Sequence, residues 1–176
     1  MKTLEQWLQD QQQSGRRLYL MLDCDGQIEA RNALISTLGI DAYRNLYLGT
    51  PAQSLAATGP YLFALAKVGH PAVQALLNAP ERDWGWLASA ANTDLDALTH
   101  HWQQRLVTGT RPNQALYRFH DNRVLARALA YLQPEQYPDY LGPISSVCYW
   151  HVERWAVSDN PQAGQYPLPA APAWLH

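Results

Sequence analysis

The segment from Leu18 to Asp23 reads Leu-Tyr-Leu-Met-Leu-Asp and places its apolar side chains one after another, with no polar residue between them. A strand with one face in water alternates apolar and polar residues, whereas an uninterrupted apolar strand is buried on both faces. Such a strand needs cover on both sides of its sheet, and helices supply that cover in α/β proteins. We therefore predict an α/β fold with a mostly buried sheet, mixed or parallel, and helices on both faces.

Strand-like and helical segments alternate along the rest of the chain, which is typical of a single α/β domain. We predict further strands at 45–49, 61–65, 85–89, 116–119, 144–150 and 154–157. Helices are predicted from the N-terminus to Ser14-Gly15, over 28–38, over 71–78, from a Thr93–Asp96 capping box to Thr108-Gly109, and after Asp121, with a short turn-like or helical piece at 134–141.

The size and charge of the chain limit what it can do. Its 176 residues, of which 47% are hydrophobic, suffice for one domain with a sizeable core. Only Lys2 and Lys67 are lysines and the formal net charge is -2, so no basic stripe for a nucleic-acid backbone is expected. Seven tryptophans and ten tyrosines raise the expectation of a protein-binding surface. We expect no nucleic acid, no membrane and no small-molecule substrate as partners, and no cofactor.

The N-terminal segment and the two cysteines bear on the cellular location of the protein, and the C-terminal segment bears on where the folded domain ends. The N-terminal segment lacks the apolar core of a signal peptide, and no apolar run approaches the roughly 18 residues of a membrane span. Cys24 and Cys148 lie in apolar sequence and are predicted to be buried thiols, which suits a cytoplasmic protein. Prolines recur after Asp159, so we expect a domain over 1–158 and a proline-rich extended tail over 159–176.

The segment Leu116-Tyr-Arg-Phe-His-Asp-Asn-Arg-Val124 combines a strand-like start with the start of a helix. Asp121 suits the N-cap position, where its carboxylate accepts hydrogen bonds from free N–H groups of the helix. Arg118 and Arg123 flank it, and a guanidinium offers five donors in a planar fork that binds carboxylates or carbonyl groups of a partner. The pattern indicates partner recognition by the two arginines. An equally open alternative is a structural ion-pair network in which both arginines bind Asp121 and other local carboxylates.

Six short motifs occur in an order and spacing that resemble a known protein family. They are Leu18–Asp23, Leu46–Gly49, Gly59–Leu62, Trp84-Gly85, Leu116–Phe119 with Asp121 and Arg123, and Tyr140–Pro143. The family is that of the adaptor chaperones of bacterial type VI secretion, once catalogued as a domain of unknown function, which load toxic effectors onto the VgrG spike. The similarity covers roughly residues 16–150.

The resemblance implies a non-enzymatic adaptor chaperone whose partners are a toxic effector and a VgrG-type spike protein. The arginine-phenylalanine-x-aspartate-x-arginine signature of the family falls on Arg118, Phe119, Asp121 and Arg123. Two features depart from the family: Asn122 stands where proline is usual, and the long C-terminal lobe of many members is missing. We expect the proline-to-asparagine change to be structurally mild.

Aromatic residues near the predicted strand ends extend the candidate site. Trp84, Trp86 and Tyr61 are candidates for an apolar groove that holds an effector helix or linker. The alternative for Tyr61 and Trp86, which we favour, is that their rings fill the core under the sheet.

One enzymatic alternative comes from the Asp23-Cys-Asp25-Gly loop. It looks like the nucleophile loop of haloacid-dehalogenase-type, magnesium-dependent phosphatases, with Asp23 as nucleophile and Asp25 as acid/base. That chemistry also needs a lysine for the phosphate, for which Lys67 is the only candidate, and a late pair of aspartates, which is absent from the sequence. His100 and His101 are adjacent and point about 100° apart on a helix, so they are not expected to bind one metal ion together, and we predict that both lie at the surface or at a helix end.

Overall fold

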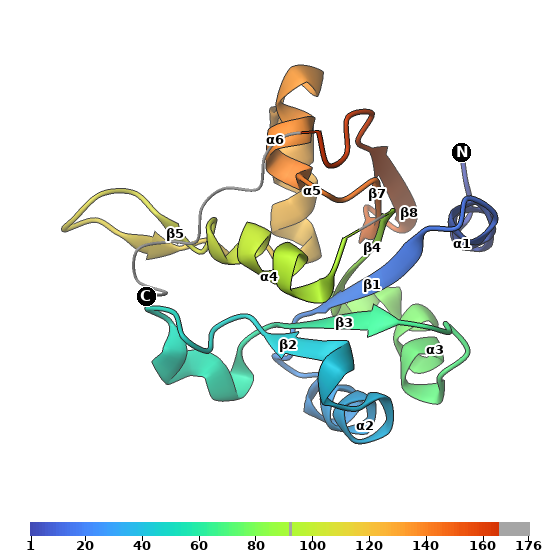
Figure 1. Cartoon of the computed structure of the whole chain (residues 1–176), viewed down its shortest axis with the longest axis horizontal. Coiled ribbons are helices and arrows are strands. Elements are labelled where there is room, and N and C mark those ends of the chain that lie inside the picture. The colour runs from blue at the N-terminus through green and yellow to red at the C-terminus, as the bar shows by residue number, and fades with distance from the viewer. Residues whose placement is uncertain (92, 166–176) are drawn as a thin grey trace.

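The computed structural model describes residues 1–91 and 93–165 and contains one main sheet with helices on both faces (Figure 1). Its six strands lie in the order β2-β3-β1-β4-β7-β8, and a separate two-stranded ribbon pairs β5 with β6. The helices are α1 Leu4–Gln13, α2 Ile28–Leu38, α3 Pro71–Leu77, α4 Leu95–Gln103, α5 Asn122–Tyr131 and α6 Tyr137–Leu141. The strands are β1 Arg17–Leu22, β2 Tyr43–Asn45, β3 Tyr61–Leu65, β4 Gly85–Ala90, β5 Val107–Thr108, β6 Ala115–Leu116, β7 Ser146–His151 and β8 Arg154–Asp159.

The α/β class and the burial of β1 on both faces are confirmed. Tyr19 and Met21 belong to the core cluster that α4, α5 and α6 close. Leu20 and Leu22 belong to the cluster on the opposite face, which α1, α2 and α3 close. Because successive side chains of a strand point to opposite faces, an apolar residue at each of these positions serves one core or the other.

The prediction of a mixed or parallel sheet is wrong, because every paired strand in the sheet runs antiparallel to its neighbours. β1 pairs with β3 from Leu18 opposite Leu65 to Leu22 opposite Tyr61, and with β4 from Arg17 opposite Ala90 to Leu22 opposite Gly85. Burial on both faces does not depend on strand direction; it requires only helices on each side of the sheet. The antiparallel arrangement brings the end of β1 and the beginnings of β3 and β4 to one end of the sheet.

Two predicted strands are shorter than expected. The strand predicted at 45–49 is replaced by β2, which ends at Asn45, and Leu46 and Tyr47 are buried in the turn that follows. The strand predicted at 116–119 ends with β6 at Leu116, and Arg118 and Asp121 form a turn in which the Asp121 N–H bonds the Arg118 carbonyl at 3.0 Å. In both segments, apolar side chains reach the core from a turn. The amino-acid composition of such a turn is the same as that of a strand, so composition alone predicted strands here.

Other local predictions differ in detail. The α4 helix is capped by Asp94, whose carboxylate accepts from the Ala97 N–H at 2.6 Å, and not by Thr93. His101, expected at the surface or at a helix end, is 1% exposed, and burial together with the Arg105 charge lowers its pKa to about 3. The buried, free thiols of Cys24 and Cys148 are as predicted.

The predicted tail does not begin at Asp159. That residue is the last of β8, and the following Asn160 is buried, with its amide donating to the carbonyls of Gly142 at 3.1 Å and Ile144 at 3.0 Å. The chain therefore remains part of the fold beyond the proposed boundary. The rest of the predicted tail, residues 166–176, lies outside the described residues.

The hairpin between β7 and β8 has an unusual turn. Its two loop residues, Val152 and Glu153, have φ values of 48° and 59°, which is the pattern of a type I′ turn. Left-handed backbone is favourable for glycine and asparagine but costly for a β-branched residue. The sequence offers no turn signal here, and Val152 is also 73% exposed.

Replacing this turn with the favoured pair, Val152→Asn with Glu153→Gly, should raise the free energy of unfolding by about 1–2 kcal/mol because it removes left-handed strain from two residues. Urea unfolding followed by tryptophan fluorescence measures the change. Glu153→Ala is the control, because alanine does not relieve the left-handed conformation. An unchanged or lower stability of the double variant would show that the turn is not strained.

Candidate functional site

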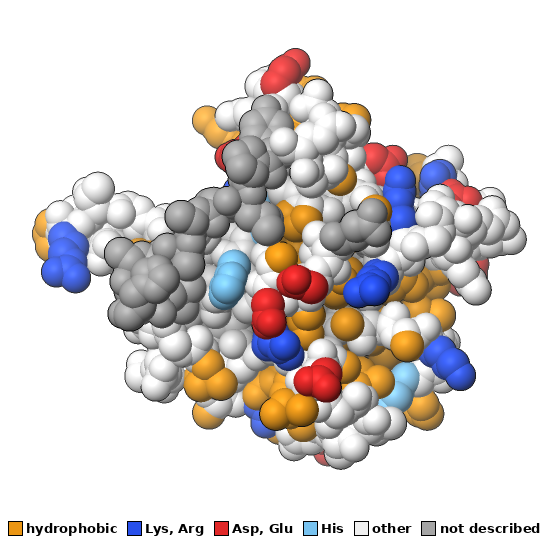
Figure 2. All heavy atoms as spheres, viewed as in Figure 1, with side chains coloured by type: hydrophobic (Ala, Val, Ile, Leu, Met, Phe, Trp, Pro, Cys, Tyr) orange, Lys and Arg blue, Asp and Glu red, His pale blue; other side chains and the backbone are white. Residues whose placement is uncertain are grey.

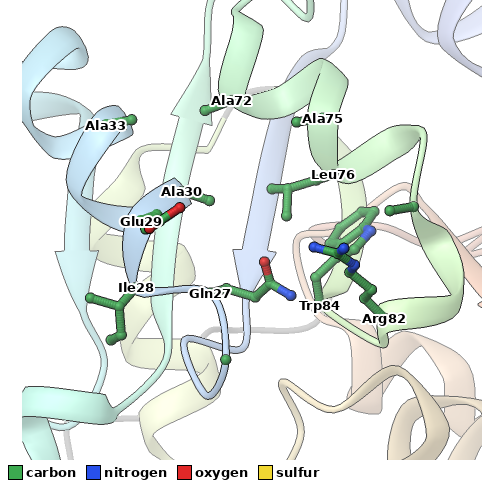
Figure 3. Close-up of a pocket in the computed structure, with 12 residues that line it drawn as sticks. Gln27, Ile28, Glu29, Ala30, Ala33, Ala72, Ala75, Leu76, Arg82 and Trp84 are labelled. Atoms are coloured by element: carbon green, nitrogen blue, oxygen red, sulfur yellow. The ribbon is translucent and has the colours of Figure 1, made fainter.

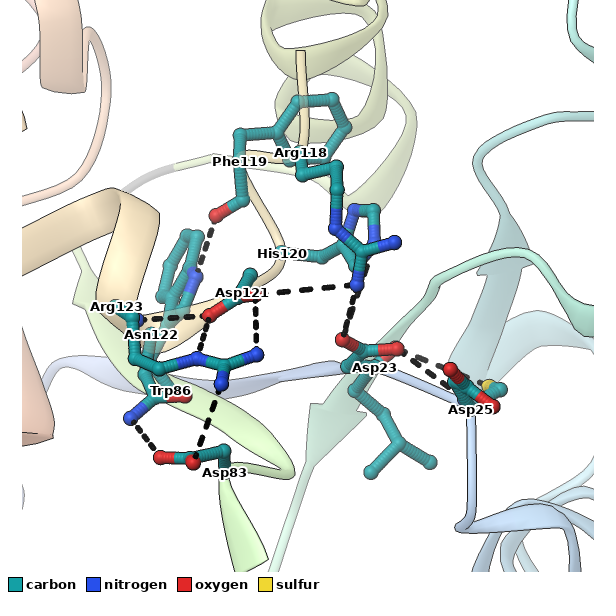
Figure 4. Close-up of polar contacts among 12 residues, drawn as sticks. Asp23, Asp25, Asp83, Trp86, Arg118, Phe119, His120, Asp121, Asn122 and Arg123 are labelled. Atoms are coloured by element: carbon teal, nitrogen blue, oxygen red, sulfur yellow. Dashed lines mark hydrogen bonds and ion pairs between the residues drawn. The ribbon is translucent and has the colours of Figure 1, made fainter. Parts of the chain in front are cut away.

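Three connecting segments meet at the end of the sheet where β1 ends and β4 begins (Figure 4). Asp23 follows β1, Asp83 precedes β4, and the turn from Arg118 to Asp121 leads into α5. Gly85, the first residue of β4, has a φ of 128°, and a Cβ atom there would lie 2.0 Å from the Met21 carbonyl oxygen. Close approach of the two strands at this point therefore requires glycine.

Asp121 is the centre of the charged network. Its Oδ1 accepts from the backbone N–H of Arg123 at 2.9 Å, which caps α5 as predicted. The Arg123 guanidinium adds two bonds, from Nε to Oδ1 at 3.0 Å and from Nη2 to Oδ2 at 2.9 Å, and Arg118 Nη2 lies 3.8 Å from Oδ2. The carboxylate is buried, whereas both arginine side chains are at least half exposed, at 50% for Arg118 and 64% for Arg123.

Asp23 joins the network from the end of β1. Its Oδ2 accepts from Arg118 Nη2 at 3.2 Å, and its Oδ1 accepts from the backbone N–H of Asp25 at 3.1 Å. Arg118 therefore lies between two buried carboxylates and still presents half of its side chain to solvent.

Asp83 and Asn122 complete the network on the side of β4. Asn122 Nδ2 donates to Asp83 Oδ1 and to the Trp150 carbonyl, each at 2.9 Å, and Arg123 Nη1 lies 3.8 Å from Asp83 Oδ2. Asn122 thus connects the start of α5 to β7 and to the connection before β4. A proline at this position would have no side-chain donor for these two bonds.

The two buried carboxylates have pKa values shifted in opposite directions. Burial raises the pKa of Asp23, and the Asp25 N–H and the Arg118 charge only partly oppose this effect. Burial alone would also raise the pKa of Asp121, but the hydrogen bonds and charge of Arg123, with the charge of Arg118, lower it overall. The two arginines therefore stabilise the charged form of Asp121, whereas burial disfavours the charged form of Asp23.

His120 lies behind the network as a neutral side chain. It is 3% exposed, and burial and the Arg118 charge lower its pKa to about 4. Its Nε2 is 4.0 Å from Asp23 Oδ2, and its Nδ1 has no hydrogen-bond partner among the described residues. The ring packs edge-on against Tyr47 and Phe119, with centroids 6.2 and 5.7 Å apart.

One family model matches the chain, the domain of unknown function DUF4123, over residues 18–139. The chain belongs to this family. The matched residues include the whole network from Asp23 to Arg123. No curated protein and no solved structure gave a significant match.

The structure brings together the signature residues that the sequence pointed out in this DUF4123 domain. Arg118, Asp121 and Arg123 form one network, and of these three side chains only the two arginines are exposed to solvent. Phe119 is completely buried against Trp102, with ring centroids 5.2 Å apart, and its carbonyl accepts from Trp86 Nε1 at 2.8 Å. It supports the site from the core.

Two of the aromatic candidates, Tyr61 and Trp84, lie at the same end of the sheet but outside the network. Tyr61 is half-buried, stacks on Phe63 at a centroid distance of 5.8 Å, and has the Arg31 guanidinium 5.7 Å from its ring centre. Trp84 is 2% exposed and packs against Trp155, so its ring belongs mainly to the core. The predicted core position of Trp86 is confirmed by its 0% exposure.

Sequence reasoning missed the contacts of Asp83 and Asn122, and it considered Asp23 as a motif residue and as the nucleophile of the phosphatase alternative but not as a partner of Arg118. Asp83 lies in a short irregular connection, and nothing in its neighbourhood signals a contact with a helix that begins 39 positions later in the chain. The departure from proline at Asn122 was the one available signal.

The geometry does not favour the phosphatase alternative. Lys67 follows the end of β3, and the β1–β3 register pairs Leu65 with Leu18 and Tyr61 with Leu22, so Lys67 and Asp23 lie at opposite ends of the strands. Four residues of strand span about 13 Å, too far for one phosphate to contact both. Asp25 is exposed, and the described residues contain no group of three His, Cys, Asp or Glu side chains placed to hold a metal ion.

The opposite pKa shifts predict that two matched substitutions will have different effects. Asp121→Asn keeps an N-cap acceptor but loses the charge that both arginines bind, so it should lower the free energy of unfolding by about 1–2 kcal/mol at pH 7. Asp23→Asn removes a carboxylate whose burial opposes its charge and should leave stability equal or higher.

The loss for Asp121→Asn should shrink as the pH falls. A carboxyl group with a lowered folded-state pKa contributes stability above its unfolded pKa, about 3.9, and loses it as the pH falls through the folded value. Urea unfolding of wild type and both variants between pH 7 and pH 3 measures this dependence. Equal losses for the two variants at every pH would contradict the electrostatic assignment.

Proposed function

We propose that this protein is a non-enzymatic adaptor chaperone that binds a toxic type VI secretion effector in the cytoplasm and helps to load it onto a VgrG-type spike. Two lines of argument support the proposal: the sequence resemblance to such adaptors and the DUF4123 membership over the same residues. The observation that carries it is the exposure of Arg118 and Arg123 on a fixed base of buried carboxylates.

The network explains how exposed arginines can act as a prepared contact. A guanidinium that already binds one carboxylate is held in position. The arginine side chain therefore loses less conformational entropy when a partner binds it. Arg123 uses Nε and Nη2 for Asp121, and Arg118 uses Nη2 for Asp23. The donors that remain on the exposed edges can bind carbonyl or carboxylate groups of an effector.

No helix in the described ranges 1–91 and 93–165 is long and apolar enough to cross a membrane. The distribution of surface charge is a separate property, and it agrees with a protein-binding role. On the face shown in Figure 2, Lys and Arg side chains are scattered among acidic and apolar ones and do not form a stripe. A mixed surface of this kind suits recognition of a protein better than neutralisation of a phosphate backbone.

Affinity capture from native lysate should recover an effector and a spike protein with the wild type, and both should be reduced with Arg118→Ala and Arg123→Ala. Each truncation is expected to weaken effector binding by about 1–3 kcal/mol if the arginine is desolvated in the interface. Mass spectrometry identifies the proteins, and titration calorimetry with the purified effector gives the affinities.

Arg127→Ala is the matched control, because Arg127 is exposed one helical turn after Arg123 and has no ion pair among the described residues. Thermal unfolding of each variant separates binding from folding. Unchanged affinity with lower stability would show that Arg118 and Arg123 are structural. Recovery of no partner, together with magnesium-dependent phosphatase activity that Asp23→Asn abolishes, would replace the adaptor function with the enzymatic alternative.

A further inference from the structure

A groove lies between α2 and α3 on the sheet face opposite α4 and α5 (Figure 3). The two helices contact each other, but small side chains line the space between them and leave a cavity of about 640 Å³. These side chains are Ala30 and Ala33 on α2 and Ala72 and Ala75 on α3, with Ala79 beyond the end of α3. Larger residues at these positions would fill the space from within.

Polar groups without partners border this apolar groove. Glu29 lines it from α2, and Arg82 lines it from the opposite side, as Figure 3 shows. Neither side chain forms an ion pair with any described residue. Trp84 also lines the groove beside Arg82; it is 2% exposed, and its Nε1 has no hydrogen-bond partner among the described residues. Arg82 is exposed and provides a cationic donor at the groove edge, whereas Trp84 Nε1 is enclosed and contributes only its ring to the lining.

The backbone of the walls determines which kind of peptide fits. An extended segment carries free N–H and C=O groups that need partners along its length. Along Ala33 and Ala75 the walls are helical backbone bonded within each helix, and they present alanine methyl groups, so an extended segment would find few backbone partners there. A helix satisfies its own backbone and places only side chains in a groove, so it can dock here without unpaired polar groups.

We propose that the α2–α3 groove binds an amphipathic helix of the effector, with its apolar face between the alanines and an acidic side chain at Arg82. The inference rests on the proposed adaptor function and specifies the chemistry of the segment that is bound. An acidic side chain can form an ion pair with Arg82, and a basic or amide side chain on the opposite flank of the helix suits Glu29.

The groove is continuous with the charged network through three consecutive residues. Arg82 and Trp84 border the groove, whereas Asp83 between them binds Asn122 and lies 3.8 Å from Arg123. Asp83 has a φ of 51°, a left-handed conformation that directs this short segment between the two surfaces. One effector can therefore contact the exposed arginines and place its helix in the groove at the same time.

The test uses the effector recovered by the wild type, both as the intact protein and as synthetic peptides of about 20 residues that tile its sequence, long enough for a helix of about 30 Å. An acidic amphipathic peptide should bind the wild type and gain helical circular dichroism. Arg82→Glu and Ala33→Leu should each weaken it roughly tenfold or more, by charge repulsion and by filling the groove. Reversing the acidic residue of the peptide to lysine should restore binding to Arg82→Glu.

Arg17→Glu is the control for the charge change, because Arg17 is exposed at the opposite end of β1. Thermal unfolding checks that each variant is folded. If the intact effector and all peptides bind Arg82→Glu and Ala33→Leu as tightly as wild type, the groove inference is wrong and the adaptor function stands. If the intact effector does not bind wild-type protein, the proposed function fails and the groove inference fails with it.

Discussion

The architecture depends on the complete burial of β1 between two layers of helices. Met21 contributes to one core and Leu22 to the other, so the strand cannot be placed at an edge or on an open face without exposing apolar surface. β3 and β4 pair with it on either side, and both run antiparallel to it. This arrangement brings Asp23, Tyr61 and Asp83 to one end of the sheet and provides the base on which the site is built.

In the site, burial disfavours the charged form of each carboxylate, and the neighbouring arginines and N–H groups favour it. Asp121 stays charged because Arg123 binds it with two guanidinium bonds and a backbone N–H, whereas Asp23, which is almost as little exposed, has fewer compensating contacts. Since the two arginines are exposed, solvent weakens their individual ion pairs. Their main contribution is therefore a fixed orientation at the surface, and the structural network and the partner-contact hypothesis are compatible with each other.

Two neighbouring surfaces share this end of the sheet, one charged and one apolar. The Arg82–Trp84 segment lies between them. Arg82 and Trp84 line the apolar groove, whereas Asp83 belongs to the charged network. The left-handed conformations of Asp83 and of Val152 and Glu153 occur in connections at this same end. Residues held in sparsely populated backbone conformations are concentrated at functional sites, because the surrounding structure compensates for their cost.

The sequence by itself determined the α/β class, the double-sided burial of β1, the N-cap role of Asp121 and the core position of Trp86, because each depends on local side-chain type and period. It also pointed to Arg118 and Arg123 as neighbours of that cap. Strand direction, the turn at Arg118 and the burial of His101 were decided by tertiary packing, since apolar composition is the same in a strand and in a buried turn. Only the fold could reveal Asp83, Asn122 and the α2–α3 groove, because their contacts join segments far apart in the chain, and no local pattern encodes such distances.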